Sequence, residues 1–98
     1  MSQRITINVG CDGTGGSHQL DKLAYTIVFG TSGNCTFTGF GFDGGTPKGF
    51  TGPVPASGTG STVTYDYDGT AIPANGYTFH YTVTGKMQGD GTGIIKNK

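Results

Sequence analysis

The sequence contains no glutamate and no tryptophan, and only four of its 98 residues are alanine and two are leucine. Helices are built most readily from alanine, leucine and glutamate, so this scarcity argues against a helical protein. Glycine and threonine are abundant instead, with twenty and sixteen residues. Threonine, valine, isoleucine, tyrosine and phenylalanine supply the ordered segments, which favours strands. The glycines follow no Gly-X-Y repeat, which excludes collagen.

Charge is also scarce. Six basic and six acidic residues give a formal net charge of zero, and the basic ones are scattered. No stripe of lysine and arginine could follow a phosphate backbone, so we expect no nucleic-acid partner. No apolar run approaches the length of a transmembrane helix, so we expect no membrane insertion. The start, MSQRITINVG, lacks the continuous apolar core of a signal peptide, which predicts a cytoplasmic protein, with export lacking a cleavable signal as the alternative.

Several segments alternate apolar and polar residues with a period of two, which is typical of strands with one face inward. They cover residues 5–9, 23–29, 63–67 and 77–83. Residues 18–29, HQLDKLAYTIVF, also show roughly helical spacing, but their β-branched and aromatic residues favour a strand.

The middle of the chain is less regular. In CTFTGFGF, Phe37 and Phe40 are three residues apart, so a bulge near Gly39 is needed to bring Phe37, Phe40 and Phe42 to one face. We expect a short edge strand at 49–50, a surface loop over 51–61 and a last strand over 94–97. Turn signals separate these segments, which predicts one antiparallel sandwich or small barrel of six or seven strands spanning residues 1–98.

The segment IPANGYTFHYTV, residues 72–83, resembles the tyrosine corner of immunoglobulin-like and fibronectin-like domains. The resemblance implies an all-β, antiparallel immunoglobulin-like β-sandwich with Tyr77 as the corner residue, whose hydroxyl bonds to backbone just upstream. Phe79 takes the place of a cysteine of true immunoglobulins. Without tryptophan, the central core aromatic is expected to be Phe37, Phe40 or Phe42.

The order of the segments ITINV, LAYTIVF, FTGFGF, TVTYDYDG, YTFHYTV and GIIKN is similar to that of the small bacterial DP-EP proteins. Members tend to have Asp-Pro before the final strand, where this chain has Thr92-Gly93. The resemblance implies a single immunoglobulin-like domain and assigns no catalytic residue.

Four aspartates directly precede a glycine, namely Asp12, Asp43, Asp68 and Asp90. Asp66 and Asp68 in DYDGT resemble a fragment of a calcium loop and are the weak candidates for a metal. Calcium needs six to eight oxygen ligands, and this chain lacks the glutamate that closes such loops. Tyr65 and Tyr67 are expected to point inward, which leaves Asp66 on an outer face. We therefore predict turn residues, and no metal or cofactor.

A catalytic centre is not expected. Cys11 or Cys35 could pair with His18 or His80, but no known family spacing surrounds either cysteine. The two cysteines could form one internal disulfide, and in a cytoplasmic protein we expect two reduced thiols. His80 alternates outward with its threonine neighbours, as an exposed strand histidine does. A small hydrolase or a metal-binding protein is therefore less favoured than a non-enzymatic protein.

The best candidate for a binding contact is Phe50, which lies in TPKGFTGPVP together with Lys48, Pro53 and Pro55. Its ring is either exposed in this loop or folded back to cap the core. The sequence thus predicts a non-enzymatic interaction module that binds an unknown protein through end loops or an exposed strand edge. The alternative is a self-assembling structural protein, a homo-oligomer or array formed through edges at 49–51 or 93–98.

Overall fold

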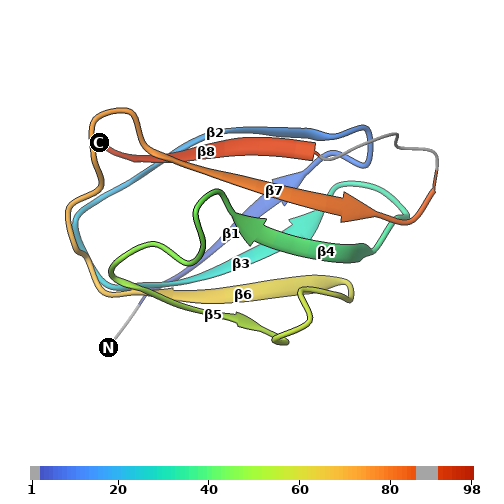
Figure 1. Ribbon diagram of the computed structural model, residues 1–98, viewed down its shortest axis with the longest axis horizontal. Coiled ribbons are helices and arrows are strands. Elements are labelled where there is room, and N and C mark those ends of the chain that lie inside the picture. The colour runs from blue at the N-terminus through green and yellow to red at the C-terminus, as the bar shows by residue number, and fades with distance from the viewer. Residues whose placement is uncertain (1–2, 86–90) are drawn as a thin grey trace.

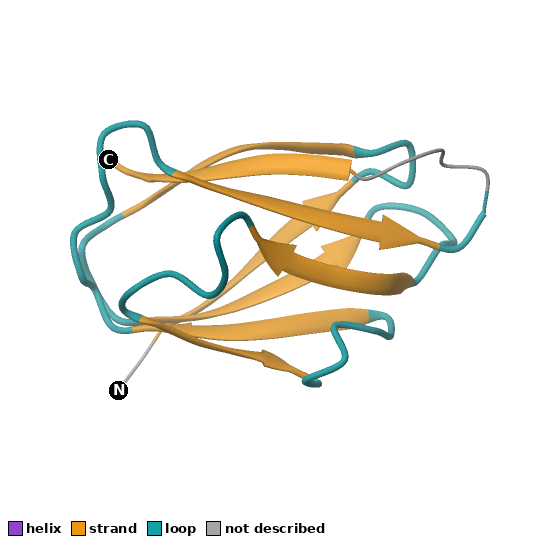
Figure 2. Cartoon of the chain, viewed as in Figure 1, coloured by secondary structure: helices purple, strands orange, loops and turns teal. Residues whose placement is uncertain are grey.

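The computed structural model describes residues 3–85 and 91–98. In these two ranges the chain forms eight strands and no helix (Figures 1 and 2). The strands are β1 (Gln3–Val9), β2 (Thr14–Leu20), β3 (Tyr25–Thr31), β4 (Phe37–Phe42), β5 (Phe50–Val54), β6 (Thr62–Tyr67), β7 (Tyr77–Val83) and β8 (Gly91–Asn97). The described residues therefore include no helix that could cross a membrane.

The strands form two four-stranded sheets, ordered β1-β3-β6-β5 and β2-β8-β7-β4. The all-β prediction is confirmed, but the purely antiparallel arrangement of six or seven strands is wrong. β1 pairs parallel with β3, and β2 pairs parallel with β8. Both parallel pairs come from the first twenty residues, whose hydrogen-bonding partners lie far along the chain. A local pattern of residues cannot show such partners.

β2 is the strand that the sequence did not predict. Its sequence, TGGSHQL, has no apolar alternation and begins within a turn signal. It becomes a strand because it can approach β8 closely: an ideal Cβ on Gly15 would lie 2.3 Å from the carbonyl oxygen of Thr92. The absence of a side chain, which makes the segment resemble a loop, is thus what permits the pairing.

A single aromatic cluster fills the space between the two sheets. Phe29 on β3 lies 5.2 Å from Phe79 on β7, and Phe40 on β4 lies 5.8 Å from Tyr65 on β6, between ring centroids. These rings bury large apolar areas and pack in tilted arrangements, as aromatic pairs prefer. The inward faces predicted for 63–67 and 77–83 are confirmed by the burial of alternate residues along β6 and β7.

The predicted bulge in β4 is confirmed. The register with β7 shifts between Phe37 and Gly39. Phe37 then lies opposite Val83, and Phe42 lies opposite Phe79, which is fully buried. The extra residue returns all three phenylalanines of β4 to the core side.

The tyrosine corner expected at Tyr77 is not found. Within the described residues, which include the whole segment upstream of it, the Tyr77 hydroxyl has no backbone hydrogen bond. Its ring is half-buried against Phe50, with centroids 6.0 Å apart. Tyr67 makes a comparable bond instead, donating from its hydroxyl to the carbonyl of Thr70. The hydroxyl of Tyr81 likewise donates to the carbonyl of Gly10 at 2.7 Å.

The Asp-Gly pairs act as turns where they are described. The side chain of Asp12 accepts a hydrogen bond from the backbone N–H of Thr14, and Asp68 accepts one from Thr70, at 3.0 and 2.9 Å. Gly13 follows Asp12 with a φ of 98°, a conformation that favours glycine. Asp90 lies outside the described residues, and the turn predicted to extend to residue 93 is too long, because β8 already begins at Gly91.

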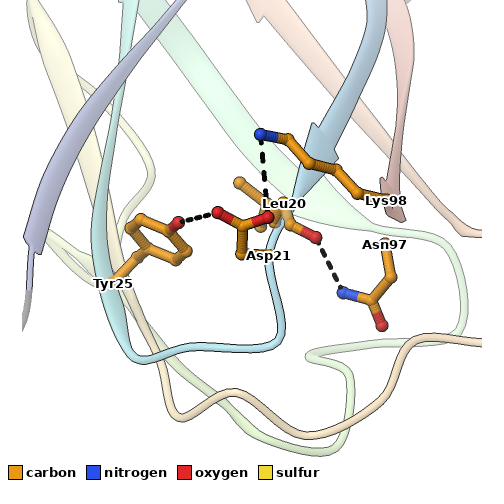
Figure 3. A network of polar contacts seen from close by, with 5 residues as sticks. All are labelled: Leu20, Asp21, Tyr25, Asn97 and Lys98. Carbon is orange, nitrogen blue, oxygen red and sulfur yellow. Dashed lines mark hydrogen bonds and ion pairs between the residues drawn. The ribbon is translucent and has the colours of Figure 1, made fainter.

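The segment 18–29 contains no helix, as favoured, but it belongs to two strands, because residues 18–20 end β2 and β3 begins only at Tyr25. Leu23 therefore lies outside β3, with 54% of its surface exposed. Polar contacts join the turn between β2 and β3 to the C-terminal end of the chain (Figure 3). The Tyr25 hydroxyl donates to Asp21, which also pairs with Lys98 at 3.7 Å. The side-chain amide of Asn97 donates to the carbonyl of Leu20 at 3.1 Å (Figure 3).

Candidate functional site

Phe50, the leading candidate for a binding contact, takes the second of the two placements that the sequence left open. Its side chain is buried at the start of β5, with 7% exposure. Its ring centroid lies 4.8 Å from that of Tyr67 and 5.5 Å from that of Phe42. The ring therefore caps the core and does not extend into solvent as a loop contact.

Several sequence candidates nevertheless come together around one open groove of about 480 Å³. Its lining comes mainly from the start of β5 and the end of β6, namely Gly49, Phe50, Thr51, Asp66, Tyr67 and Asp68. Hydrogen bonds from Thr70 hold the pKa of Asp68 below its usual range, and the charge of Lys48 adds to this. We call this site the β5–β6 groove.

The β5–β6 groove offers few free polar groups. Asp66 points outward, as predicted, and accepts a hydrogen bond from the Thr26 hydroxyl at 3.1 Å. Asp68 is engaged by the backbone and the hydroxyl of Thr70. Residues 3–85 and 91–98 contain no group of three or more histidine, cysteine or acidic side chains placed to hold a metal ion. Two occupied carboxylates fall well short of the six to eight oxygens that calcium requires.

Pro53 lies within the edge strand β5 and Pro55 directly follows it, and neither lines the groove. Both follow cis peptide bonds, and Gly52 and Pro53 fall out of register between Thr51 and Val54. Proline has no N–H to donate, so this edge cannot offer a continuous ladder to another strand.

The two cysteines form a disulfide, so the expectation of two reduced thiols is wrong. The parallel pairing of β1 and β3 explains this, because Val9 lies opposite Thr31 at the ends of the two strands. The segments that follow both strands emerge at the same end of the molecule, which brings Cys11 and Cys35 together. The sequence alone does not reveal this bond, because the parallel pair that brings the two cysteines together has no local signal.

The histidines are engaged separately. The Nε2–H of His18 donates to the carbonyl of Gly15 at 2.7 Å, and Nδ1 of His80 lies 2.8 Å from a carboxylate oxygen of Asp43. Each histidine thus has a local partner, and neither cysteine carries a thiol that could act as a nucleophile.

The four sheet edges, β1, β2, β4 and β5, differ in how they are protected. Residues 58–60 cover β4, since Phe37 and Gly60 exchange two backbone hydrogen bonds. β2 has a bulge between Thr14 and Gly16, and its first carbonyls already accept hydrogen bonds. β5 is interrupted at Gly52 and Pro53. The last strand, β8, lies between β2 and β7, so the edge suggested at 93–98 does not exist.

Among residues 3–85 and 91–98, nothing covers, bulges or interrupts the edge formed by β1. Its seven residues, QRITINV, include no glycine or proline. The carbonyl of Val9 accepts a hydrogen bond from Ser32 on the β3 side, whereas the N–H of Gly10 points away and donates to Thr14. Because successive residues of a strand direct their backbone groups to opposite sides, alternate residues of β1 direct theirs away from β3. These residues, the free edge of β1, are Arg4, Thr6 and Asn8.

The free edge of β1 is exposed as well as unpaired. Its three side chains are exposed, and no described residue forms a backbone hydrogen bond with its N–H and C=O groups. The intervening residues face the core, with Ile7 buried and Ile5 half-buried. The free edge of β1 is therefore a row of donors and acceptors beside a partly exposed apolar side chain.

No family model, no curated protein and no solved structure matches the chain.

Proposed function

We propose that this chain is a non-enzymatic interaction module that takes up an extended polypeptide segment as an additional strand beside β1. The observation that carries the proposal is the free edge of β1, where the N–H and C=O groups of Arg4, Thr6 and Asn8 point away from β3 and form no backbone hydrogen bond with a described residue. In strand addition, main-chain hydrogen bonds supply affinity and alternate side chains supply specificity. The other three edges are covered, bulged or interrupted.

The side chains along β1 indicate what kind of segment would fit. On the outer face they are polar and exposed, with a single charge at Arg4. On the core side, half-buried Ile5 can receive an apolar neighbour. A partner strand should therefore alternate polar and apolar residues, and place an apolar side chain next to Ile5.

The strand order supports assigning the fold to the immunoglobulin-like class. Counted along the chain, β3-β6-β5 follows the order B-E-D of that fold, and β8-β7-β4 follows G-F-C. β1 and β2 together stand in place of the first strand, one beside each sheet. We also propose that the chain is related to the DP-EP proteins, because its strand-forming segments follow a similar order along the sequence.

The disulfide supports two further parts of the proposal. It leaves neither cysteine able to act as a thiol nucleophile, which favours a binding role over a hydrolase. Disulfides persist mainly in oxidising compartments. We therefore place the function of this chain in such a compartment in preference to the cytoplasm.

The test is a selection from a library of displayed seven-residue peptides against the domain. Binding of the selected peptides should be lost in Thr6→Pro, which removes one donor from the free edge of β1 and leaves the ladder with β3 intact. The matched control is Gln19→Pro on β2. The carbonyl of Leu20 accepts a hydrogen bond from the N–H of Lys98 and so faces β8, which means that the backbone groups of its neighbour Gln19 face away from β8. Gln19→Pro should keep the binding.

Selected peptides that bind Thr6→Pro and the unchanged domain equally well would overturn the proposal. Circular dichroism of both proline variants verifies that they are folded. A further expectation is that the selected sequences alternate polar and apolar residues, because one face meets solvent and the other meets Ile5.

A further inference from the structure

We infer that the strand taken up beside β1 is β1 of a second copy, so that two chains form a symmetric dimer with one continuous eight-stranded sheet. This inference rests on the proposed function, since it names the partner of the same edge. Closed two-fold pairs are the commonest oligomers, and their interface uses the same patch on both subunits. A strand that pairs with itself about a two-fold axis must run antiparallel to its copy.

The register follows from the free edge of β1. If the two-fold axis passes between the two Thr6 residues, Arg4 lies opposite the second copy's Asn8 and Thr6 opposite the second copy's Thr6. All three residues then face residues that also direct their backbone groups across the interface. In an antiparallel pair such facing residues exchange both hydrogen bonds. This register therefore satisfies every backbone group of the free edge at once.

The side chains agree with this register. The one charge on the strand, Arg4, meets an uncharged Asn8 and not a second arginine, so no like charges face each other. Threonine pairs directly across a strand pair are favourable. On the core side, half-buried Ile5 comes beside the second copy's Ile7, which extends the apolar layer across the interface.

Other edges do not offer this self-complementarity. β5 keeps only Phe50, Thr51 and Val54 in register with its neighbour. β4 is occupied at Phe37 by Gly60, and an ideal Cβ on Gly58 would lie 2.8 Å from the backbone nitrogen of Phe40. The edge at 49–51 suggested by the sequence is thus a poorer candidate than β1.

The first experiment is sedimentation velocity from about 10 μM to about 1 mM. The unchanged chain should shift from monomer to dimer with concentration. Thr6→Pro should weaken the dimer at least about tenfold, because it removes a donor from each of the two symmetric bonds at the axis. Gln19→Pro should leave the dimer unchanged, since it keeps every backbone donor of β1.

The second experiment tests the register with single cysteines under mild oxidation. In a hydrogen-bonded antiparallel pair, facing Cα atoms are about 5.5 Å apart, which lies within the range that a disulfide spans. Thr6→Cys should therefore form a covalent dimer. Asn8→Cys should not, because the two copies of residue 8 are offset by about 13 Å along the strands. Mixing Arg4→Cys with Asn8→Cys should restore the cross-link.

The outcomes separate the two proposals. A chain that stays monomeric up to the highest concentration, while selected peptides still bind in a Thr6-dependent way, overturns the dimer and keeps strand addition. A dimer that is indifferent to Thr6→Pro, or an Asn8→Cys variant that cross-links as readily as Thr6→Cys, also overturns the dimer through β1. If the chain forms no dimer and also binds no selected peptide, both proposals are overturned.

Discussion

Single residues decide how closely the strands of this molecule approach one another. Two glycines of β8 lie opposite large rings of β7, with Gly91 facing Tyr81 and Gly93 facing Phe79. An ideal Cβ on Gly91 would lie 2.4 Å from the ring of Tyr81. The rings therefore lie across glycine backbone, and their bulk replaces the side chains that the glycines lack.

Gly93→Ala is expected to lower the free energy of unfolding by about 2–3 kcal/mol, because overpacking in a filled core forces rings and backbone to shift. The new Cβ would lie 2.3 Å from the ring of Phe79 and 2.8 Å from the backbone of Gly15. Gly41→Ala is the control, since its Cβ would meet only His80, at 3.5 Å. Urea denaturation measures both, and equal losses would contradict the role given to Gly93.

Because the phenol of Tyr65 is buried, the free energy of unfolding depends on pH in the alkaline range. Burial raises the pKa of Tyr65 from its ordinary value of 10.0 to about 12. Between these values the unfolded chain loses the proton and the folded chain keeps it. The stabilisation present below pH 10.0 is therefore lost progressively as pH rises toward about 12.

We expect the unfolding free energy of the unchanged chain to fall more steeply above pH 10.0 than that of Tyr65→Phe. Urea denaturation at a series of pH values, with ultraviolet absorbance to follow ionisation, makes the comparison. The hydroxyl of Tyr81, whose pKa is also raised by burial, stays in both proteins and does not affect the difference. Parallel curves for the two proteins would contradict the assignment.

Among the elements, the strands differ in how clearly the sequence predicts them. β6 and β7 alternate strictly, and their inward residues are buried as expected. The sequence of β2 predicts a turn, because a strand of glycine and mostly polar residues has no alternation of its own. Its existence depends on β8, since Gly15 approaches Thr92 too closely for any side chain. Alternation thus predicts strands that carry the core, and misses a strand held by backbone pairing.

Asn97 at the end of β8 joins three segments of chain. Its amide nitrogen donates to Leu20 and to the Tyr67 hydroxyl, and its oxygen accepts from the N–H of Ile72 at 2.6 Å. Asn97→Ala leaves the N–H of Ile72 without its partner. We expect a loss of about 1–3 kcal/mol in the free energy of unfolding.

The matched control for this element is Asn34→Ala, because Asn34 is exposed in the β3–β4 loop. Thermal and urea denaturation should show little change in that variant. If the two alanine variants unfold alike, the bonds of Asn97 do not hold the end of β8 as described.

At the scale of the whole molecule, β1, β2 and the turn between them determine how the two sheets are joined. The first twenty residues supply β1 to one sheet and β2 to the other, both in parallel pairs, and the turn between them carries Cys11. The disulfide then ties this turn to the segment before β4, across 24 residues of sequence. The same arrangement leaves β1 at an edge, where the proposed partner strand would add.

Replacing both cysteines by alanine is expected to lower the free energy of unfolding by about 3 kcal/mol, mainly because the unfolded chain regains the freedom that the closed loop removes. A reductant should destabilise the unchanged chain by a similar amount and should not affect the double variant. Mass spectrometry after alkylation without reductant reports the bond directly. Two alkylated cysteines in the purified protein would contradict it.

The sequence by itself determined the all-β class, the inward faces of the alternating strands, the bulge at Gly39 and the turns at Asp12, Asp43 and Asp68. These features depend on neighbouring residues, whose spacing and backbone preferences act locally. Only the tertiary structure decided the two parallel pairs, the disulfide, the burial of Phe50 and which edge is free. Each of these depends on contacts between residues far apart in the chain, which no local pattern records.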